Sequence, residues 1–316
     1  MAARSCGFKS HLWHLDKKPR IIVILGPTAS GKSDLAVALA KKFNGEIISA
    51  DSRQVYKGLD IGTGKITKKE MQGVKHHLLD VANPRKQFTV SDFVNVTNET
   101  IVQIITKNKL PIICGGTGFY IDALLGDKQV PEVPPNLKLR KGLEKKSVDK
   151  LFEILQKLDP ERSKNIDAKN PRRLVRAIEI CKALGKVPKI VVSSKQLVVR
   201  KFEILKIGIK VEEKELKKRI NKRLEKRLKQ GMVREAQNLH KKGLSFKRMR
   251  ELGLEYGRLA DFLEKKISKE EMIEKLQIEI YQYAKRQMTW FKKDKSIVWL
   301  EPKIKLAQNE IYRFLV

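Results

Sequence analysis

The fold is decided by one stretch near the N-terminus, Gly26-Pro27-Thr28-Ala29-Ser30-Gly31-Lys32-Ser33. An apolar run at 21–25 precedes it and an amphipathic run at 34–40 follows it, so strand, glycine-rich loop and helix succeed one another. The spacing is that of the phosphate loop G-x-x-x-x-G-K-[ST], whose backbone N–H groups at a helix N-terminus surround phosphate oxygens. A tight glycine-rich turn without a ligand is the alternative. The agreement of the loop with both flanking elements favours a phosphate site, but it does not specify which phosphate is bound.

Two side chains of this loop bear on its chemistry. Lys32 adds a positive charge beside the anion, and the Ser33 hydroxyl can bind Mg²⁺. Gly26 and Gly31 let the backbone fold closely around the phosphate without a Cβ in the way.

Composition places the chain among globular proteins. Its 316 residues are 41% hydrophobic and 33% charged, which suits a buried core with an inserted or second domain. No apolar run is long enough to span a membrane. The three cysteines, at 6, 114 and 181, form neither a disulfide framework nor a zinc motif. We therefore expect a cytoplasmic protein with reduced thiols.

The net charge is extreme. Lysine and arginine number 68 against 36 aspartate and glutamate residues, a net charge of +32. Such a field favours a polyanionic partner, although a lysine-rich composition spread over solvated helices explains part of it. Residues 1–20 carry five bases and one acid and lack the apolar core of a signal peptide. We expect a flexible leader there, with a transit peptide as the alternative.

Strand-like and helix-like runs alternate in the first part of the chain. Strands are predicted at 21–25, 46–50, 77–81 and 111–114, and helices at 34–40 and 89–107. This alternation is typical of a parallel sheet with crossover helices. The predicted fold class is therefore α/β, a P-loop NTPase-like parallel sheet flanked by helices, with a mostly helical insertion domain.

The pattern changes at Pro131, Pro134 and Pro135, a predicted domain boundary. The stretch 136–201 is mostly amphipathic helix. After it the chain shows a strand-like run at 202–211, basic helices at 212–242 and 268–292, a strand at 296–300 and a helix at 304–315. The predicted domains are a leader at 1–20, an α/β core at 21–128 and 202–316, and a helical insertion at 129–201.

Polar residues follow two of the predicted strands, at the sheet edge where ligands bind in open α/β folds. Asp51 ends the second strand and is a candidate general base, with capping of the next turn as an equal alternative. Gly115-Gly116-Thr117-Gly118 ends a later strand, where the backbone can approach a ligand closely and Thr117 can form a hydrogen bond. A plain helix-entry turn is the alternative for this second glycine loop.

Basic side chains gather in three helical stretches. Arg172, Arg173 and Arg176 lie in the first turn of a helix that begins at Pro171, where they oppose the helix dipole and so indicate a nearby anion. A solvated face is the alternative.

The second stretch is an i,i+4 row of Arg219, Arg223 and Arg227. We expect most of this helix to be solvated, with one arginine of the row able to reach an active-site phosphate. The third stretch, 285–293, interleaves bases with Trp290 and Phe291 and can hold phosphates, although aromatic residues there are more typical of a core.

Taken together, these motifs resemble the tRNA dimethylallyltransferase (isopentenyl transferase) family of P-loop proteins. The motifs that carry the resemblance lie at 26–33, 50–56, 58–64, 115–120, 171–173 and 285–291. They follow the order of the family over nearly the whole chain. Each motif except the first is weak by itself, and the series is specific.

The resemblance implies a reaction that a phosphate loop for ATP or GTP does not suggest. Members of the family transfer a dimethylallyl group from dimethylallyl diphosphate to the N6 amine of adenosine 37, on the 3′ side of the anticodon of tRNA, and release diphosphate. The implied partners are dimethylallyl diphosphate and the tRNA anticodon stem–loop, and the implied cofactor is Mg²⁺ on Ser33. The target base has to leave its stack to react.

The resemblance also assigns roles to residues. Asp51 would be the general base for N6, while Thr28, Lys32 and Arg223 would act on the leaving diphosphate, held by the whole loop 26–33. The residues implied in tRNA binding are Asp51, Ser52, Arg53, Gln54, Thr117, Arg172, Arg173, Leu174, Val175, Arg176, Lys285, Arg286, Gln287, Trp290 and Lys292.

Two stretches depart from the family pattern. Arg227 stands where relatives often carry an apolar residue, and 251–257 fits the family's glycine–tyrosine segment only loosely, so it is assigned no role. No Cys/His cluster like the zinc-finger extension of eukaryotic relatives is present, which predicts a bacterial-type enzyme, and we expect a monomer. Three alternatives stay open: a small-molecule P-loop kinase, an adenylate isopentenyltransferase, and an RNA-binding P-loop module without catalysis.

Overall fold

A computed structural model describes residues 18–126, 131, 133–188 and 202–316. The chain divides into two compact units, Met1–Gly126 with Val198–Val316, and Asp127–Leu197. These bounds are close to the predicted limits at 129 and 201. The predicted leader falls outside the described residues, apart from 18–20.

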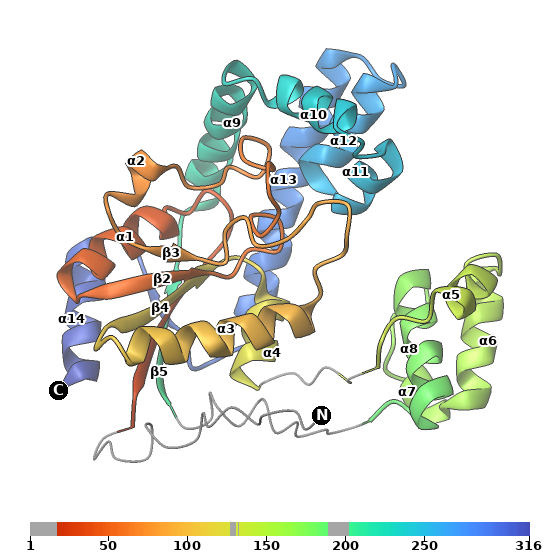
Figure 1. Cartoon of the computed structure of the whole chain (residues 1–316), viewed down its shortest axis with the longest axis horizontal. Coiled ribbons are helices and arrows are strands. Elements are labelled where there is room, and N and C mark those ends of the chain that lie inside the picture. The colour runs from red at the N-terminus through yellow and green to blue at the C-terminus, as the bar shows by residue number, and fades with distance from the viewer. Residues whose placement is uncertain (1–17, 127–130, 132, 189–201) are drawn as a thin grey trace, which may run out of the picture. The chain divides into compact units, whose positions relative to one another are not determined.

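A parallel six-stranded sheet organises the described part of the larger unit (Figure 1). Its strands are β1 (Arg20–Leu25), β2 (Gly45–Ser49), β3 (His76–His77), β4 (Leu110–Gly115), β5 (Glu203–Ile209) and β6 (Val298–Leu300). The order across the sheet is β3-β2-β4-β1-β5-β6, and every pairing is parallel. The carboxyl ends of β1, β2 and β4 therefore meet at one edge, which brings the phosphate loop, Asp51 and the second glycine loop together. The predicted P-loop α/β fold is confirmed.

Helices cover both faces of this sheet (Figure 1). Those of the larger unit are α1 (Lys32–Lys42), α2 (Lys68–Met71), α3 (Val90–Ile105), α4 (Gly118–Leu125), α9 (Glu213–Lys229), α10 (Met232–Lys241), α11 (Phe246–Leu252), α12 (Leu254–Leu263), α13 (Lys269–Phe291) and α14 (Ile304–Leu315). Ile22 and Ile24 of β1 pack against α1 and α14, because alternate residues of a strand face the same side. The intervening residues of β1 face the other side, where α3 packs against β2 and β4.

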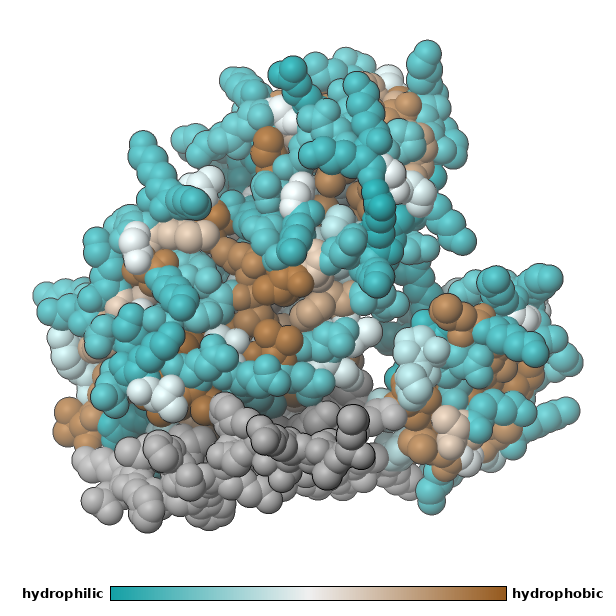
Figure 2. Space-filling view, viewed as in Figure 1, coloured by the Kyte–Doolittle hydropathy of each residue, from teal (hydrophilic) through white to brown (hydrophobic). Residues whose placement is uncertain are grey.

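A second core of the larger unit lies among the C-terminal helices. The basic helix α9 turns Leu216, Ile220 and Leu224 inward, and α13 contributes Leu276 and Ile280 to the same cluster. Most bases of these helices lie on the opposite, exposed faces, as in an ordinary amphipathic helix, whereas Arg223 and Arg227 of α9 point inward. Hydrophilic side chains accordingly dominate the view in Figure 2.

Two predicted elements are wrong in extent. The strand predicted at 77–81 is only two residues long, because the backbone turns into the left-handed region at Leu78 (φ 62°) and Asp80 (φ 57°). The helix predicted at 212–242 is two helices, α9 and α10, separated at Gly231, whose φ of 98° interrupts the helical path.

The smaller unit consists of helices in its described residues: α5 (Leu137–Leu143), α6 (Val148–Leu158), α7 (Pro160–Ser163) and α8 (Pro171–Leu184). The Asn170 side chain accepts the backbone N–H of Arg173 and caps α8, with Pro171 in the first turn as the sequence predicts. None of the helices among the described residues of either unit has the length and apolar character needed to cross a membrane.

Candidate active site

The phosphate loop joins the end of β1 to the start of α1. Gly31, the residue before the helix, has a φ of 89°, and Gly26 has so little room that an added Cβ would lie 3.1 Å from the carbonyl oxygen of Ile209. Both positions therefore need glycine. The side chain of Lys32 folds back over the loop, and its Nζ donates to the carbonyl of Pro27 at 3.2 Å. This geometry directs the lysine charge toward the concave side of the loop.

A cavity of about 70 Å³ opens beside the loop. Residues from the carboxyl ends of β1, β2 and β4 line it together with side chains from α9 and α13. The polar lining residues are Thr28, Lys32, Ser33, Ser49, Asp51, Gln54, Thr63, His76, Arg223, Tyr283 and Gln287. The structure thus brings the predicted catalytic residues Thr28, Lys32, Asp51 and Arg223 to one cavity.

Two of the cations that face this cavity, Lys32 and Arg223, are partly buried. Arg223 donates from Nη1 to Thr28 Oγ1 at 3.4 Å and from Nη2 to the carbonyl of Gly64 at 2.9 Å. Burial, followed by the charge of Arg227, lowers the pKa of Arg223. Burial likewise lowers the pKa of Lys32. Among the ion pairs between described residues, neither cation has a carboxylate partner, so their charges are available to an anion in the cavity.

Asp51 caps the turn after β2, as one of the two alternatives predicted, and its role as general base stays a prediction. Its Oδ1 accepts the backbone N–H groups of Arg53 at 2.8 Å and Gln54 at 3.2 Å, which caps the turn after β2. The carboxylate also lines the cavity, together with Thr28, Lys32 and Ser33 of the phosphate loop. The two capping bonds, both to Oδ1, restrain the orientation of the group.

The second glycine loop lies close to Asp51. An added Cβ on Gly115 would overlap the carbonyl of Ala50, so this close approach of β4 and β2 requires glycine. Thr117 Oγ1 accepts the backbone N–H of Ser52 at 3.1 Å. The predicted pair Ser52 and Thr117 therefore joins the two loops beside Asp51.

Gln287 has a structural role that its predicted tRNA contact did not include. Its side chain is buried; Oε1 accepts the N–H of Thr28 at 2.8 Å and Nε2 donates to the carbonyl of Gly116 at 2.7 Å. The amide bridges the two glycine loops. Its predicted contact with tRNA stays a prediction, and the structure adds this bridging role.

Tyr283 was missed by the sequence analysis. It lines the cavity from α13, four residues before Gln287, and burial raises its pKa to about 12. The i,i+4 spacing to Gln287 is a signal that places both on one helix face. Cys114 also lines the cavity, and burial raises the pKa of its thiol to about 11, which keeps it protonated and unreactive.

The basic residues predicted to bind tRNA near the end of α13 are exposed. Lys285, Arg286 and Lys292 are exposed, and they stay predictions as tRNA ligands. Trp290 is partly buried; its Nε1 donates to Asp122 at 2.9 Å and its ring meets Phe119 edge to face.

The predicted tRNA-binding run of α8 divides by helix face. Arg172 and Arg173 are exposed, whereas Leu174 and Val175 are buried in the core of the smaller unit. The helical period turns the side chains of Leu174 and Val175 into this core, so Arg172 and Arg173 are the members of the run that face solvent. Arg176 pairs with Glu179 and donates to the carbonyl of Val133 at 2.9 Å, so it stabilises the unit.

The arginines of the i,i+4 row on α9 also differ in their surroundings. Arg223 reaches the cavity, while Arg227 is buried and pairs with Glu255 at 2.9 Å. The stretch 251–257, to which the sequence analysis assigned no role, therefore supplies the counterion of Arg227.

Comparison with known proteins agrees with this geometry. The model of the family described as IPP transferase matches residues 54–294. The chain belongs to this family. The resemblance seen in its motifs is thereby confirmed.

Relatives of the IPP transferase family match over most of their length. The tRNA dimethylallyltransferase of Anoxybacillus flavithermus is 39% identical over 285 residues, which cover 89% of this chain and 90% of the relative. The crystal structure of a tRNA isopentenylpyrophosphate transferase from Staphylococcus epidermidis superposes with a TM-score of 0.68 at 39% identity, covering 94% of this chain and 99% of the other. A eukaryotic dimethylallyltransferase acting on tRNA gives a TM-score of 0.76 at 26% identity, covering 92% of this chain and 75% of the other.

Proposed function

We propose that this protein is a tRNA dimethylallyltransferase, which transfers a dimethylallyl group from dimethylallyl diphosphate to N6 of adenosine 37 and releases diphosphate. One observation carries the proposal. Lys32 and Arg223 face the cavity of the phosphate loop with no carboxylate partner among the described ion pairs, and Asp51 lies on the same cavity. Two cations for a leaving diphosphate and one base for an amine are the groups that this transfer needs.

In the proposed reaction the bond between C1 of the dimethylallyl group and the diphosphate oxygen breaks, and the bond between N6 and C1 forms. Negative charge grows on the diphosphate, where Lys32, Arg223 and the loop N–H groups stabilise it. Asp51 accepts the proton that N6 loses. Thr28, whose Oγ1 lies 3.4 Å from Arg223 Nη1, orients the leaving group beside the guanidinium.

A divalent cation, Mg²⁺, is part of the proposal. The Ser33 hydroxyl lines the cavity and is a hard oxygen donor, which fits Mg²⁺. The described residues contain no cluster of three or more His, Cys, Asp or Glu side chains that could hold a metal, so substrate phosphates would complete the coordination. When bound, the ion would neutralise charge on the diphosphate.

The RNA partner follows from charge and exposure. The net charge of +32 and the exposed Arg172, Arg173, Lys285, Arg286 and Lys292 support binding of the tRNA anticodon stem–loop. A monomer in the cytoplasm completes the proposal.

Radiolabel transfer tests it. Purified protein with Mg²⁺ and labelled dimethylallyl diphosphate should place label in a tRNA with adenosine 37, and none in a matched tRNA with guanosine at that position. Nucleoside mass spectrometry should locate the group on that adenosine. Label on free AMP in preference to tRNA would support an adenylate isopentenyltransferase instead, and consumption of ATP without tRNA would support a kinase.

A further inference from the structure

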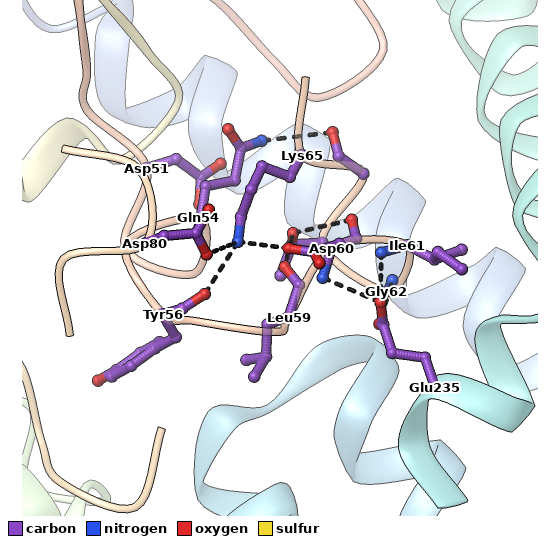
Figure 3. A network of polar contacts seen from close by, with 12 residues as sticks. Asp51, Gln54, Tyr56, Leu59, Asp60, Ile61, Gly62, Lys65, Asp80 and Glu235 are labelled. Atoms are coloured by element: carbon purple, nitrogen blue, oxygen red, sulfur yellow. Dashed lines mark hydrogen bonds and ion pairs between the residues drawn. The ribbon is translucent and has the colours of Figure 1, made fainter. Parts of the chain in front are cut away.

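A loop beside the cavity is held from within by one carboxylate. Glu235 of α10 accepts the backbone N–H groups of Asp60 at 3.0 Å, Ile61 at 2.7 Å and Gly62 at 2.9 Å (Figure 3). The hydroxyl of Tyr256 donates to the same carboxylate at 2.6 Å. Four donors on one carboxylate saturate its stronger acceptor positions, so the loop 60–62 is fixed to α10.

A lysine fixes the far side of the same loop. Lys65, whose side chain is only 6% exposed, donates from Nζ to Asp60 at 2.6 Å, to Asp80 at 2.5 Å and to the carbonyl of Tyr56 at 2.9 Å (Figure 3). The segment between Asp60 and Lys65 is thus restrained at both ends by charge-assisted hydrogen bonds.

Between these anchors the loop meets the cavity. The carbonyl of Gly64 accepts from Arg223 Nη2 at 2.9 Å and from Gln54 Nε2 at 3.4 Å, and Thr63 lines the cavity. Gly64 has a φ of 59°, and an added Cβ would overlap the Arg223 guanidinium. The loop backbone therefore determines where the guanidinium lies relative to Thr28 of the phosphate loop.

We propose that Glu235 is a positioning residue of the transferase: it holds 60–62 so that the carbonyl of Gly64 sets Arg223 over the phosphate loop. The proposal rests on the function proposed above. Glu235 is not among the residues that line the cavity, so its effect passes through Arg223. A displacement of about 1 Å in a catalytic group can cost on the order of 100-fold in rate.

Glu235→Gln is the direct test, because it preserves the size of the side chain but removes its charge and turns an N–H₂ group toward backbone N–H donors. We expect kcat/KM for dimethylallyl diphosphate to fall roughly 30- to 100-fold, with tRNA affinity unchanged. Glu225→Gln makes the same chemical change at an exposed site on α9 and should leave both quantities within about twofold of the wild type.

Coupling to Arg223 separates positioning from a general loss of stability. In an Arg223→Gln background, Glu235→Gln should lower kcat/KM by less than about threefold more, because the group that it positions is already absent. Tyr256→Phe removes one donor to Glu235 and should cause a drop of a few fold in the same parameter, so a poorly folded Glu235 variant does not leave the proposal without a test.

The outcomes are distinct. An active wild type with an equally active Glu235→Gln variant overturns the positioning role alone. A reduction of the same size in both Arg223 backgrounds also overturns it and assigns Glu235 to stability. A folded wild type without transfer to tRNA overturns the proposed function and the positioning role with it.

Discussion

The two units of this protein differ in whether their inward-facing charged side chains form ion pairs. In the larger unit, Lys32 and Arg223 are partly buried beside the phosphate loop, and no carboxylate pairs with either among the described ion pairs. In the smaller unit, Glu179 is only 1% exposed but receives Arg140 at 2.7 Å, Arg176, and the backbone N–H of Asn136 at 2.6 Å. Neither Lys32 nor Arg223 thus forms an ion pair among the described residues, whereas Glu179 has two arginine partners.

This difference distinguishes charged groups that can bind a ligand from charged groups that stabilise the fold. A buried charge without a counterion costs free energy, which a protein recovers when an anion binds. A fully paired buried charge has nothing left for a ligand and contributes to the fold only. On this criterion the cavity of the larger unit is the candidate catalytic site, and Arg176, although it lies in an arginine-rich run, stabilises its own unit.

The largest expected effect is that of Asp51→Asn, which retains the cap but removes the base. The kcat should fall by about 10³-fold, or about 4 kcal/mol, with tRNA affinity within about twofold of the wild type. Asp34→Asn, the same change at an exposed carboxylate of α1, is the matched control. Single-turnover assays with saturating tRNA measure the effect. Retention of wild-type kcat in the Asp51 variant would show that another group accepts the proton.

Removal of the Glu179 charge should lower the free energy of unfolding of the smaller unit. Glu179→Gln leaves Arg140 and Arg176 without their counterion, and we expect about 3 kcal/mol of destabilisation. Hydrogen exchange of peptides from α5 and α8 at neutral pH measures it. Glu153→Gln breaks an exposed pair with Lys150 on α6 and should cost less than about 0.5 kcal/mol. Equal effects of the two changes would contradict the comparison.

The depressed pKa of the Glu179 carboxylate predicts that the stability of the smaller unit depends on pH. Burial acts to raise the pKa of Glu179, but hydrogen bonds from Arg140 and Arg176 outweigh it and hold the pKa at about 2, below the ordinary 4.5. Because the folded pKa is depressed, the stabilisation is complete above pH 4.5 and is lost as the pH falls toward 2. Cleavage of the wild-type smaller unit by pepsin should therefore accelerate across this window. The Glu179→Gln variant should lack this contribution to the acceleration.

Removal of Arg223, which forms no ion pair among the described residues, should lower activity without lowering the melting temperature. Arg223→Gln should lower kcat/KM by about 100-fold, because one donor to the leaving diphosphate is lost. The melting temperature should not fall, since a buried cation without a counterion contributes no ion pair. Lys222→Gln, at the adjacent exposed position, is the control. A lower melting temperature for Arg223→Gln would show that Arg223, like Arg176, stabilises the fold.

The smallest effects are expected at the exposed arginines of α8. Arg172→Ala and Arg173→Ala should each weaken tRNA binding about threefold and reduce the dependence of log K on log salt concentration by about 1. Lys182→Ala, near the other end of the helix, is the control. Filter binding at several salt concentrations measures the slope, and an unchanged slope for both arginines would remove them from the RNA surface.

The motifs predicted much of the site because they combine short sequence spacing with fixed strand ends. The loop 26–33 and Asp51 each follow a buried strand, and parallel strands place such ends at one edge of a sheet. The sequence was a weaker guide where consecutive residues were all assigned the same role. The stretch 172–176 contains two exposed arginines, two buried apolar residues and one arginine paired with Glu179, and only the helix face that each occupies separates them.

What the sequence determined by itself was the phosphate loop, the parallel α/β class and the family, since these depend on local spacing and on the order of elements. The tertiary structure alone decided which charges are compensated. Gln287 bridges two glycine loops from a distant helix, and Glu235 receives three N–H groups of a loop far from it in the chain. No local pattern encodes such partners, because burial and hydrogen bonding between distant segments depend on how the helices pack.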